Sequence, residues 1–232
     1  MWYKVNKIYV WTTKVRPSGW TPWSNTVAYR PLTTSSTVND MSGNNRNLTN
    51  NWATFWTYGW ADCMRLNNSS NYLQWNIWDI SQYSHTISIW AYKTWWEWDY
   101  YLAQRWIWKS EHKWWTEIIQ RRSNYIRYAF WFDDLDSPNN YATWAWHNIV
   151  LQYNKSSNSQ IMYIDWTKVG ERNCTYTHTI YSTTNFVIWR NNVLTSWQYW
   201  NGYLSNFIVE SKLRTAQEVD LYYRTTKSNY WL

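Results

Sequence analysis

The residues with the clearest potential for chemistry are acidic and amide side chains crowded into one short stretch. The segment "DDLDSPNN" contains Asp133, Asp134, Asp136 and Asn139, and Asn140 follows directly. Ca²⁺ binds several oxygen ligands, which carboxylates, amides and backbone carbonyls of loops supply. The stretch therefore predicts a calcium site at the first four of these residues. The spacing is not that of an EF-hand, and a solvated acidic loop is the alternative.

A second acidic segment bears on catalysis. In "EWDYYL", Glu97 and Asp99 alternate, so a strand would turn both carboxylates to one face. Retaining glycoside hydrolases need a pair of carboxyl groups beside the scissile bond. Jelly-roll glycoside hydrolases of the laminarinase type carry the pattern E-x-D-x-x-E on one strand. Leu102 stands where this pattern has its second glutamate. Because the pair is incomplete, we expect a protein that is not an enzyme.

Histidine and cysteine give no metal or nucleophile pattern. The histidines lack metal-ligand spacing, and neither Cys63 nor Cys174 belongs to a C-x-x-C unit, so no zinc site is predicted. One long-range disulfide and two free thiols both stay open. A Ser-His-Asp triad cannot be read from spacing because its members meet only in space. We interpret His147 as a structural strand residue.

Charge and hydropathy exclude several partners. The chain has 232 residues and a formal net charge of +7, with the positive residues scattered. Without blocks of like charge, a nucleic-acid-binding arm is not indicated. No run of 18 or more apolar residues exists, so no membrane span is expected. The start "MWYKVNKIYV" lacks the apolar region of a secretory signal.

The segments that position these residues are predicted to be short strands. Residues 1–24 form a short β segment that ends in the linker "RPSGWTPW", and residues 25–232 form one domain. In "HTISIWAYK", Ile87 and Ile89 share one face and Trp90 shares the other with Tyr92. The alternation predicts an all-β antiparallel sandwich. One helix is predicted near the end, where Thr215 and Glu218 form a capping box.

Five segments, in order, resemble a laminin-G-like, concanavalin A-like jelly-roll domain. They are "TVAYRPLTTSSTVNDMSGNNRNLT", "ADCMRLNNSSNYLQW", "DISQYSHTISIWAYK", "ATWAWHNIVLQYN…QIMYIDWTKVG" and "YWNGYLSNFIVESKLRTAQEVDLYY". The first is similar to the family's aromatic-Pro-Leu strand and Asp-x-Ser-Gly-Asn turn. The fourth is similar to its Trp-His-x-Val strand and Asp-Gly hairpin. The resemblance covers about residues 25–224 and implies the jelly-roll sandwich, a fold that hosts many functions.

Tryptophan replaces glycine at several family positions. Glycine occurs 5 times and tryptophan 25 times, although glycine makes up about 7% of average sequence. Trp11, Trp144, Trp166 and Trp189 stand where the family has glycine, whereas Trp90 and Trp146 stand where it has tryptophan. The codon UGA is one base from a glycine codon, and some bacteria and their viruses read it as glycine. We hypothesise that a gene of that kind was translated with UGA as tryptophan. A protein rich in genuine tryptophan is the alternative.

The resemblance implies recognition rather than catalysis. We expect a carbohydrate- or cell-surface-binding module whose partner is a glycan or surface receptor, with loop residues Tyr141, Trp197, Tyr199 and Asn201 as ligand contacts. The leading segment resembles those of phage and prophage structural proteins. This favours an extracellular or virion appendage that works beside other subunits. The alternative is a structural subunit whose strand at residues 3–16 pairs with a neighbour's sheet edge.

Overall fold

The structure of the chain is a computed structural model. It describes residues 24–32, 39–59, 61–67, 71–76, 83–94, 100–105, 116–120, 125–130, 133–138, 141, 144–176, 185–188, 201–230 and 232. The predicted N-terminal β segment, residues 1–24, lies outside this part of the chain except for its last residue.

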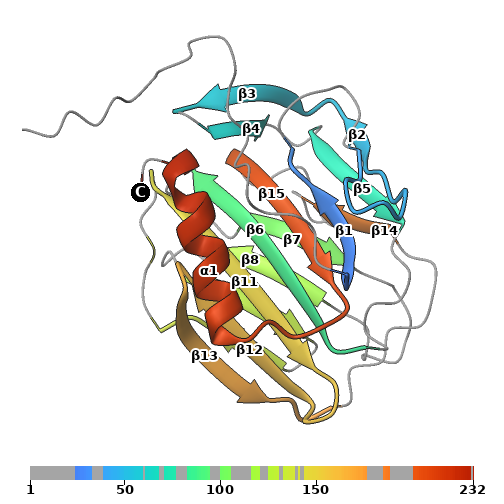
Figure 1. The fold of residues 1–232 in the computed structure, drawn as a ribbon, viewed down its shortest axis with the longest axis vertical. Helices are drawn as coiled ribbons and strands as arrows, with labels where there is room; N and C mark the ends of the chain where they lie inside the picture. Colours follow the sequence, from blue (N-terminus) through green and yellow to red (C-terminus); the bar gives the residue numbers. More distant parts are fainter. Residues whose placement is uncertain are drawn as a thin grey trace, which may run out of the picture.

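The strands form two antiparallel sheets, and the predicted all-β sandwich is confirmed (Figure 1). The eight-stranded sheet has the order β13 (Thr167–Asn173), β12 (Ser159–Ile164), β11 (Trp146–Asn154), β6 (His85–Lys93), β15 (Gly202–Glu210), β4 (Ala61–Leu66) and β3 (Thr54–Tyr58), with β1 (Thr26–Arg30) paired to β15. The seven-stranded sheet has the order β10 (Asp133–Asp136), β9 (Ile126–Phe130), β8 (Thr116–Gln120), β7 (Tyr100–Arg105), β14 (Asn185–Ile188), β5 (Tyr72–Asn76) and β2 (Thr49–Asn51).

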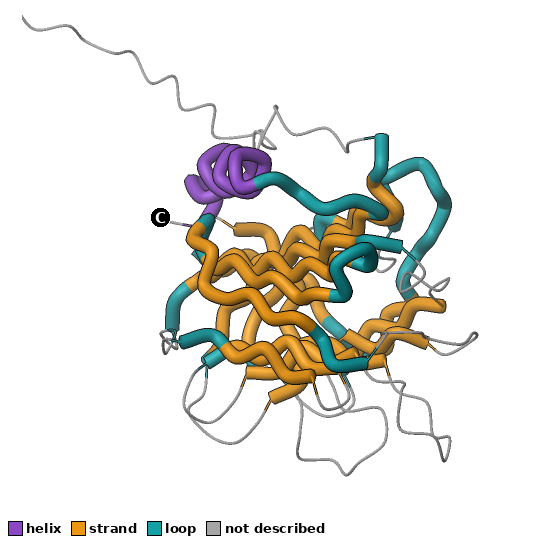
Figure 2. Tube along the Cα trace, turned by 90° about the horizontal axis from the view of Figure 1, so that it is seen from below, coloured by secondary structure: helices purple, strands orange, loops and turns teal. Residues whose placement is uncertain are grey.

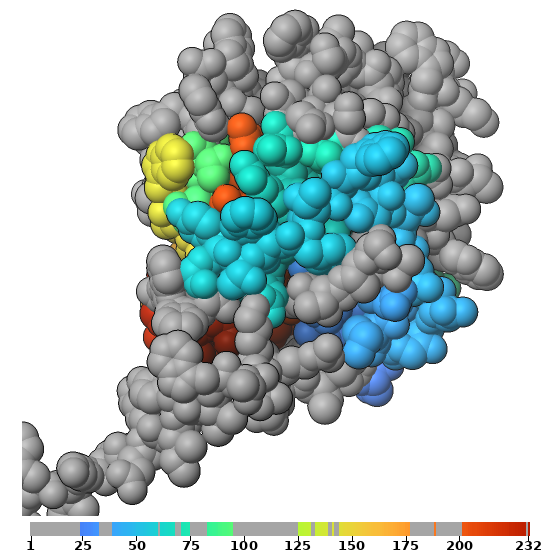
Figure 3. Space-filling model, turned by 90° about the horizontal axis from the view of Figure 1, so that it is seen from above, coloured from blue at the N-terminus to red at the C-terminus, as the bar shows by residue number. Residues whose placement is uncertain are grey.

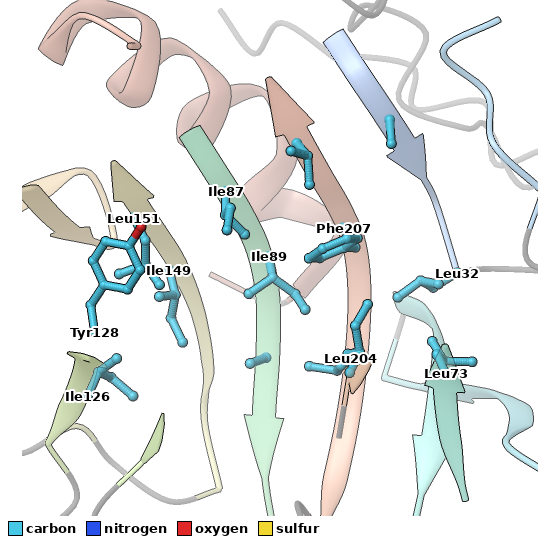
Figure 4. Close-up of a cluster of buried hydrophobic side chains, with 14 of the residues drawn as sticks. Leu32, Leu73, Ile87, Ile89, Ile126, Tyr128, Ile149, Leu151, Leu204 and Phe207 are labelled. Atoms are coloured by element: carbon cyan, nitrogen blue, oxygen red, sulfur yellow. The ribbon is translucent and has the colours of Figure 1, made fainter. Parts of the chain in front are cut away.

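The main core lies between the two sheets. The inward residues of β6, Ile87 and Ile89, pack beside Ile149 of β11 and Phe207 of β15, and Tyr128 comes from the seven-stranded sheet (Figure 4). Alternation places these side chains on one face of each strand. The faces predicted for residues 85–92 are therefore confirmed.

The outer face of the eight-stranded sheet carries a second core beneath the C-terminal helix (Figure 2). Helix α1 (Ala216–Thr226) begins at Thr215, which accepts from the backbone N–H of Glu218, while the Glu218 carboxylate accepts from the backbone of Thr215. The predicted capping box is confirmed. The short 3-10 helix η2 (Lys227–Tyr230) follows and adds Tyr230 to this core.

Polar contacts fasten the helix to that outer face. The indole N–H of Trp90 donates to the Thr226 hydroxyl at 3.2 Å. Arg214, just before the helix, forms a fully buried ion pair with Glu210 of β15 at 2.5 Å. Burial raises the pKa of Glu210, and the charge of Arg214 acts against that rise.

The Asp-x-Ser-Gly-Asn turn closes a loop against β1. The carboxylate of Asp40 accepts hydrogen bonds from the backbone N–H groups of Tyr29, Ser42 and Arg46 at 2.9–3.0 Å. Burial alone would raise the pKa of Asp40, but these bonds outweigh it and lower the pKa. The aspartate is therefore the residue that gives this loop its shape.

The hairpin between β12 and β13 turns through Asp165 and Trp166. Their φ angles are +48° and +67°, and Ile164 pairs with Thr167 on either side. Positive φ at both central residues defines a type I′ turn, which favours Asn-Gly or Asp-Gly. The backbone is therefore the one expected for Asp-Gly. Trp144 also has a positive φ, +70°, whereas Trp11 and Trp189 lie outside the described residues.

Candidate functional site

Several strand ends meet at one end of the eight-stranded sheet. β6 ends where β15 begins, since Lys93 pairs with Gly202, and β11 begins beside them, since Trp146 pairs with Tyr92. In Figure 1 this end lies near the C-terminal end of α1. We call it the rim; it comprises Thr94, Tyr141, Trp144, His147, Asp165, Trp166 and Asn201. Loops at the ends of a sandwich are frequent sites of binding because a rigid scaffold positions them.

Thr94 holds Asn201 at the rim. The backbone N–H and the hydroxyl of Thr94 both donate to the Asn201 carbonyl at 2.9 Å, and the hydroxyl also reaches the side-chain oxygen at 3.0 Å. The last of these bonds engages the oxygen of the Asn201 side-chain amide. The NH₂ group is therefore the end that this side chain can offer a ligand.

Asp165 ties the hairpin turn to β11. One carboxylate oxygen lies 2.7 Å from Nδ1 of His147, and the other accepts from the backbone N–H of Asn148 at 2.8 Å. The backbone N–H of Asp165 donates to the Asn148 carbonyl at 2.9 Å. The carboxylate thus fixes the plane of the imidazole ring and the position of the turn together.

Tyr141 lies against this pair. Its ring meets the His147 ring edge to face, with centroids 5.4 Å apart and an interplanar angle of 76°. Burial raises the pKa of Tyr141, and the charge of Asp165 raises it further. The side chain is half-buried, with its inner part on the main core.

The predicted ligand contacts divide into described and undescribed residues. Tyr141 and Asn201 both lie at the rim, whereas Trp197 and Tyr199 fall outside the described residues. Asp165 and His147 join the rim, although the sequence marked one as a turn residue and the other as a structural strand residue. Only their spatial pairing shows that they belong to this group.

The rim combines aromatic rings with hydrogen-bonding groups of both kinds. Tyr141 offers a ring face or edge, Asp165 a carboxylate acceptor, and Asn201 an amide donor. Saturated sugar rings carry C–H groups on their faces and hydroxyls at their edges, and so they suit such a mixture.

Two indoles flank these residues in the chain as translated. Trp144 is exposed, and its backbone N–H donates to the carbonyl of Lys93 at 2.9 Å. Trp166 lies over Tyr223 of α1, with ring centroids 4.4 Å apart. The Nζ of Lys227 lies 5.6 Å from the same Tyr223 ring. Helix α1 therefore contributes a tyrosine next to the rim, and η2 contributes a cation.

The aspartates of the predicted calcium site make contacts with protein groups. Asp133 is buried and accepts from the backbone N–H groups of Thr175 and Tyr176 at 2.9–3.1 Å, with Arg172 of β13 at 3.2 Å. Asp134 and Asp136 point to the other side of β10, where both pair with Arg127 at 2.6–2.7 Å. Asp133 thus links β10 to the edge of the other sheet.

The calcium site stays a prediction because Asn139 lies outside the described residues. Among the described residues, no group of three or more histidine, cysteine or acidic side chains could hold a metal ion. Glu97 and Asp99 also lie outside the described residues, and the side chain of Leu102 is not described. Cys63 and Cys174 are not joined in a disulfide. No described helix is long and apolar enough to cross a membrane.

Comparison with known proteins adds the fold of toxin binding domains. No protein-family model and no curated protein matches the chain. Among solved structures, the botulinum neurotoxin serotype D binding domain matches with a TM-score of 0.65 at 12% identity, over 87% of this chain and 52% of that one. The binding domain of Paraclostridial Mosquitocidal Protein 1 matches with a TM-score of 0.67 at 15% identity, over 86% and 52%.

A third matching structure concerns botulinum neurotoxin type C, whose cell entry is dependent upon interaction with two ganglioside molecules. It matches with a TM-score of 0.66 at 10% identity, over 87% of this chain and 51% of that one. At these identities the likeness shows the fold, a β-sandwich shared with binding domains. This chain spans about half the length of the chains it matches.

Proposed function

We propose that this chain is a non-enzymatic carbohydrate-binding module that recognises a glycan at a cell surface through the rim. The observation that carries the proposal is the placement of Tyr141, His147, Asp165 and Asn201 at the same end of the eight-stranded sheet. Each side chain is fixed by a partner before any ligand arrives, so binding would order few groups. The match to binding domains, one of them described with gangliosides, supports the same class of ligand.

The proposal also covers the fold family of the chain, the larger assembly it belongs to and its source genome. We propose a laminin-G-like jelly roll that belongs to a virion appendage or surface adhesin, located outside the cell or on a virion. The ordered family segments support the first part. The hairpin at Asp165 and Trp166, which has the backbone of Asp-Gly, supports a source genome that reads UGA as glycine. Such a genome fits the phage-like leading segment.

A structural subunit is the second candidate, favoured by an observation at the sheet edge. β3 is an edge strand of the eight-stranded sheet, and three of its five residues are exposed. Residues 50–59, in cyan, spread across the face seen in Figure 3. An edge strand presents unpaired backbone groups that a strand from another subunit could complete.

A glycan array separates the two candidates. The full chain would be applied with and without Ca²⁺, as translated and with glycine at residues 144 and 166. The proposal predicts binding to a defined set of glycans that Tyr141→Ala together with Asn201→Ala abolishes. Binding that needs Ca²⁺ would support the predicted calcium site. No binding in any arm, with self-association in light scattering, would favour the structural subunit.

A further inference from the structure

The tryptophans whose side chains are described divide into contrasting groups. Trp90 and Trp146 are 0% and 4% exposed and lie within strands of the outer core. Trp52, Trp144 and Trp166 are 80%, 54% and 46% exposed. These last three have φ angles of +61°, +70° and +67°. The remaining one, Trp56, is an exposed strand residue of β3 and falls in neither group.

A positive φ is unusual for so large a side chain. Eight described residues other than glycine have a positive φ, and four of them are asparagine or aspartate. Those two types enter the left-handed region readily because their short polar side chains form local hydrogen bonds. Three of the other four are tryptophan. Residue type therefore fits the backbone at the Asn and Asp positions and conflicts with it at the three tryptophans.

Leu32 is the eighth non-glycine residue with a positive φ, and it shows how packing can compensate for the strain of that conformation. Its φ is +57°, and it is buried in the main core, where packing offsets the backbone strain. Each of the three tryptophans leaves about half or more of its surface in solvent. Packing therefore offers them much less compensation than it offers Leu32.

The local turns match glycine instead. Asp165 and Trp166 occupy a type I′ turn, in which the second position favours glycine. Gly59, one of the chain's few glycines, has a φ of +68°, the same as these tryptophans within a few degrees. The fold therefore requires the same left-handed backbone conformation at Gly59 and at the three tryptophans.

We infer that the natural protein carries glycine at residues 52, 144 and 166 and tryptophan at residues 90 and 146. One reassigned codon accounts for all three exposed positions, since UGA and the glycine codon GGA differ by one base. Residues 144 and 166 are also glycine positions of the family that the sequence resembles. Residue 52 is not one of those positions, so the structure alone assigns it to this group. Exposure and φ together therefore separate tryptophans that stand for glycine from tryptophans that the fold uses.

The inference changes the surface offered by the rim. With glycine at 144, the rim loses one exposed indole. With glycine at 166, the Tyr223 ring loses the indole that lies 4.4 Å from it, and it then faces solvent near Asp165. The ring available to a ligand at this corner is then the tyrosine of α1.

Thermal unfolding of full-chain variants tests the inference. Trp52→Gly, Trp144→Gly and Trp166→Gly should each raise Tm by about 2–4 °C, because glycine removes the left-handed strain. The matched variants with alanine at the same sites should fall clearly short of that rise, because alanine keeps the strain. Trp90→Gly, at a packed strand position, should lower Tm sharply.

Two outcomes would overturn the inference. One is that the glycine variants unfold at or below the temperature of the parent chain. The other is that alanine raises Tm as much as glycine, because removal of an exposed indole would then be the cause. Peptide sequencing of the protein made by its natural host gives an independent reading: glycine at 166 and tryptophan at 90 are expected, and tryptophan at both would refute the assignment.

Discussion

The outer face of the eight-stranded sheet and the rim at its end contain the same residue type in opposite settings. Trp90 stacks on Tyr230 with ring centroids 4.0 Å apart and donates to Thr226 beneath the helix. Trp166 stands in a two-residue turn with a positive φ and an exposed indole. The first is demanded by packing and the second conflicts with its backbone. A residue count alone would treat them as equal evidence for an aromatic binding surface.

The comparison also separates structure from function. Side chains on the helix-covered face are buried and bonded to one another, so their replacement should reduce stability. Side chains at the rim are held by partners yet remain partly exposed, so their replacement should affect binding first. The predictions below test this division.

Trp90→Ala should have the largest effect. Loss of a fully buried indole, its stacking on Tyr230 and its bond to Thr226 should lower the free energy of unfolding by about 3–5 kcal/mol. Urea unfolding followed by circular dichroism measures the change. Trp56→Ala, which removes an exposed indole on β3, is the matched control and should cost under about 0.5 kcal/mol. Equal losses for the two variants would break the comparison.

Asp165→Asn should have a moderate effect at the rim. Asparagine keeps the left-handed backbone accessible but removes the charge that faces His147, so unfolding should become easier by about 1 kcal/mol. Affinity for the glycan found on the array should fall at the same time. If stability falls by several kcal/mol instead, Asp165 belongs with the packed face rather than with a binding site.

The pH dependence of the helix cap should be the smallest effect. Burial acts to raise the pKa of Glu218, but the bonds from Lys212 and from the backbone of Thr215 outweigh it and lower the pKa. A lowered pKa contributes stability that is fully present above the ordinary glutamate pKa of about 4.3 and is lost as pH falls through the lower folded value. Glu218→Gln should therefore be less stable than the parent at neutral pH, and the gap should close toward pH 3. An unchanged gap would show that the charge has no part in the cap.

Periodicity and local turn chemistry predicted most of the fold. The alternation in residues 85–92 placed the isoleucines and Trp90 on opposite faces, and the Thr215–Glu218 spacing placed the helix start. Both depend on contacts close in sequence or on one buried face. The left-handed turn at Trp166 was also predictable, because the family has glycine there.

The site was less accessible to sequence reasoning. Tyr141 and Asn201 were predicted as polar or aromatic loop residues, but the carboxylate of Asp165 and the ring of His147 meet only because β11 and β12 pair in one register. In the acidic stretch from Asp133, residues adjacent in sequence point to different sides of a strand. Clustering in sequence suggested shared ligands, whereas strand alternation sends Asp133 to one side and Asp134 to the other.

A crystal structure of the glycine-restored chain with the oligosaccharide selected on the array would test the central claim most directly. The account predicts a sugar at the rim, with a ring against Tyr141 and hydroxyls within hydrogen-bonding distance of Asp165 or Asn201. A sugar bound on the helix-covered face, or at the opposite end of the sandwich, would contradict it.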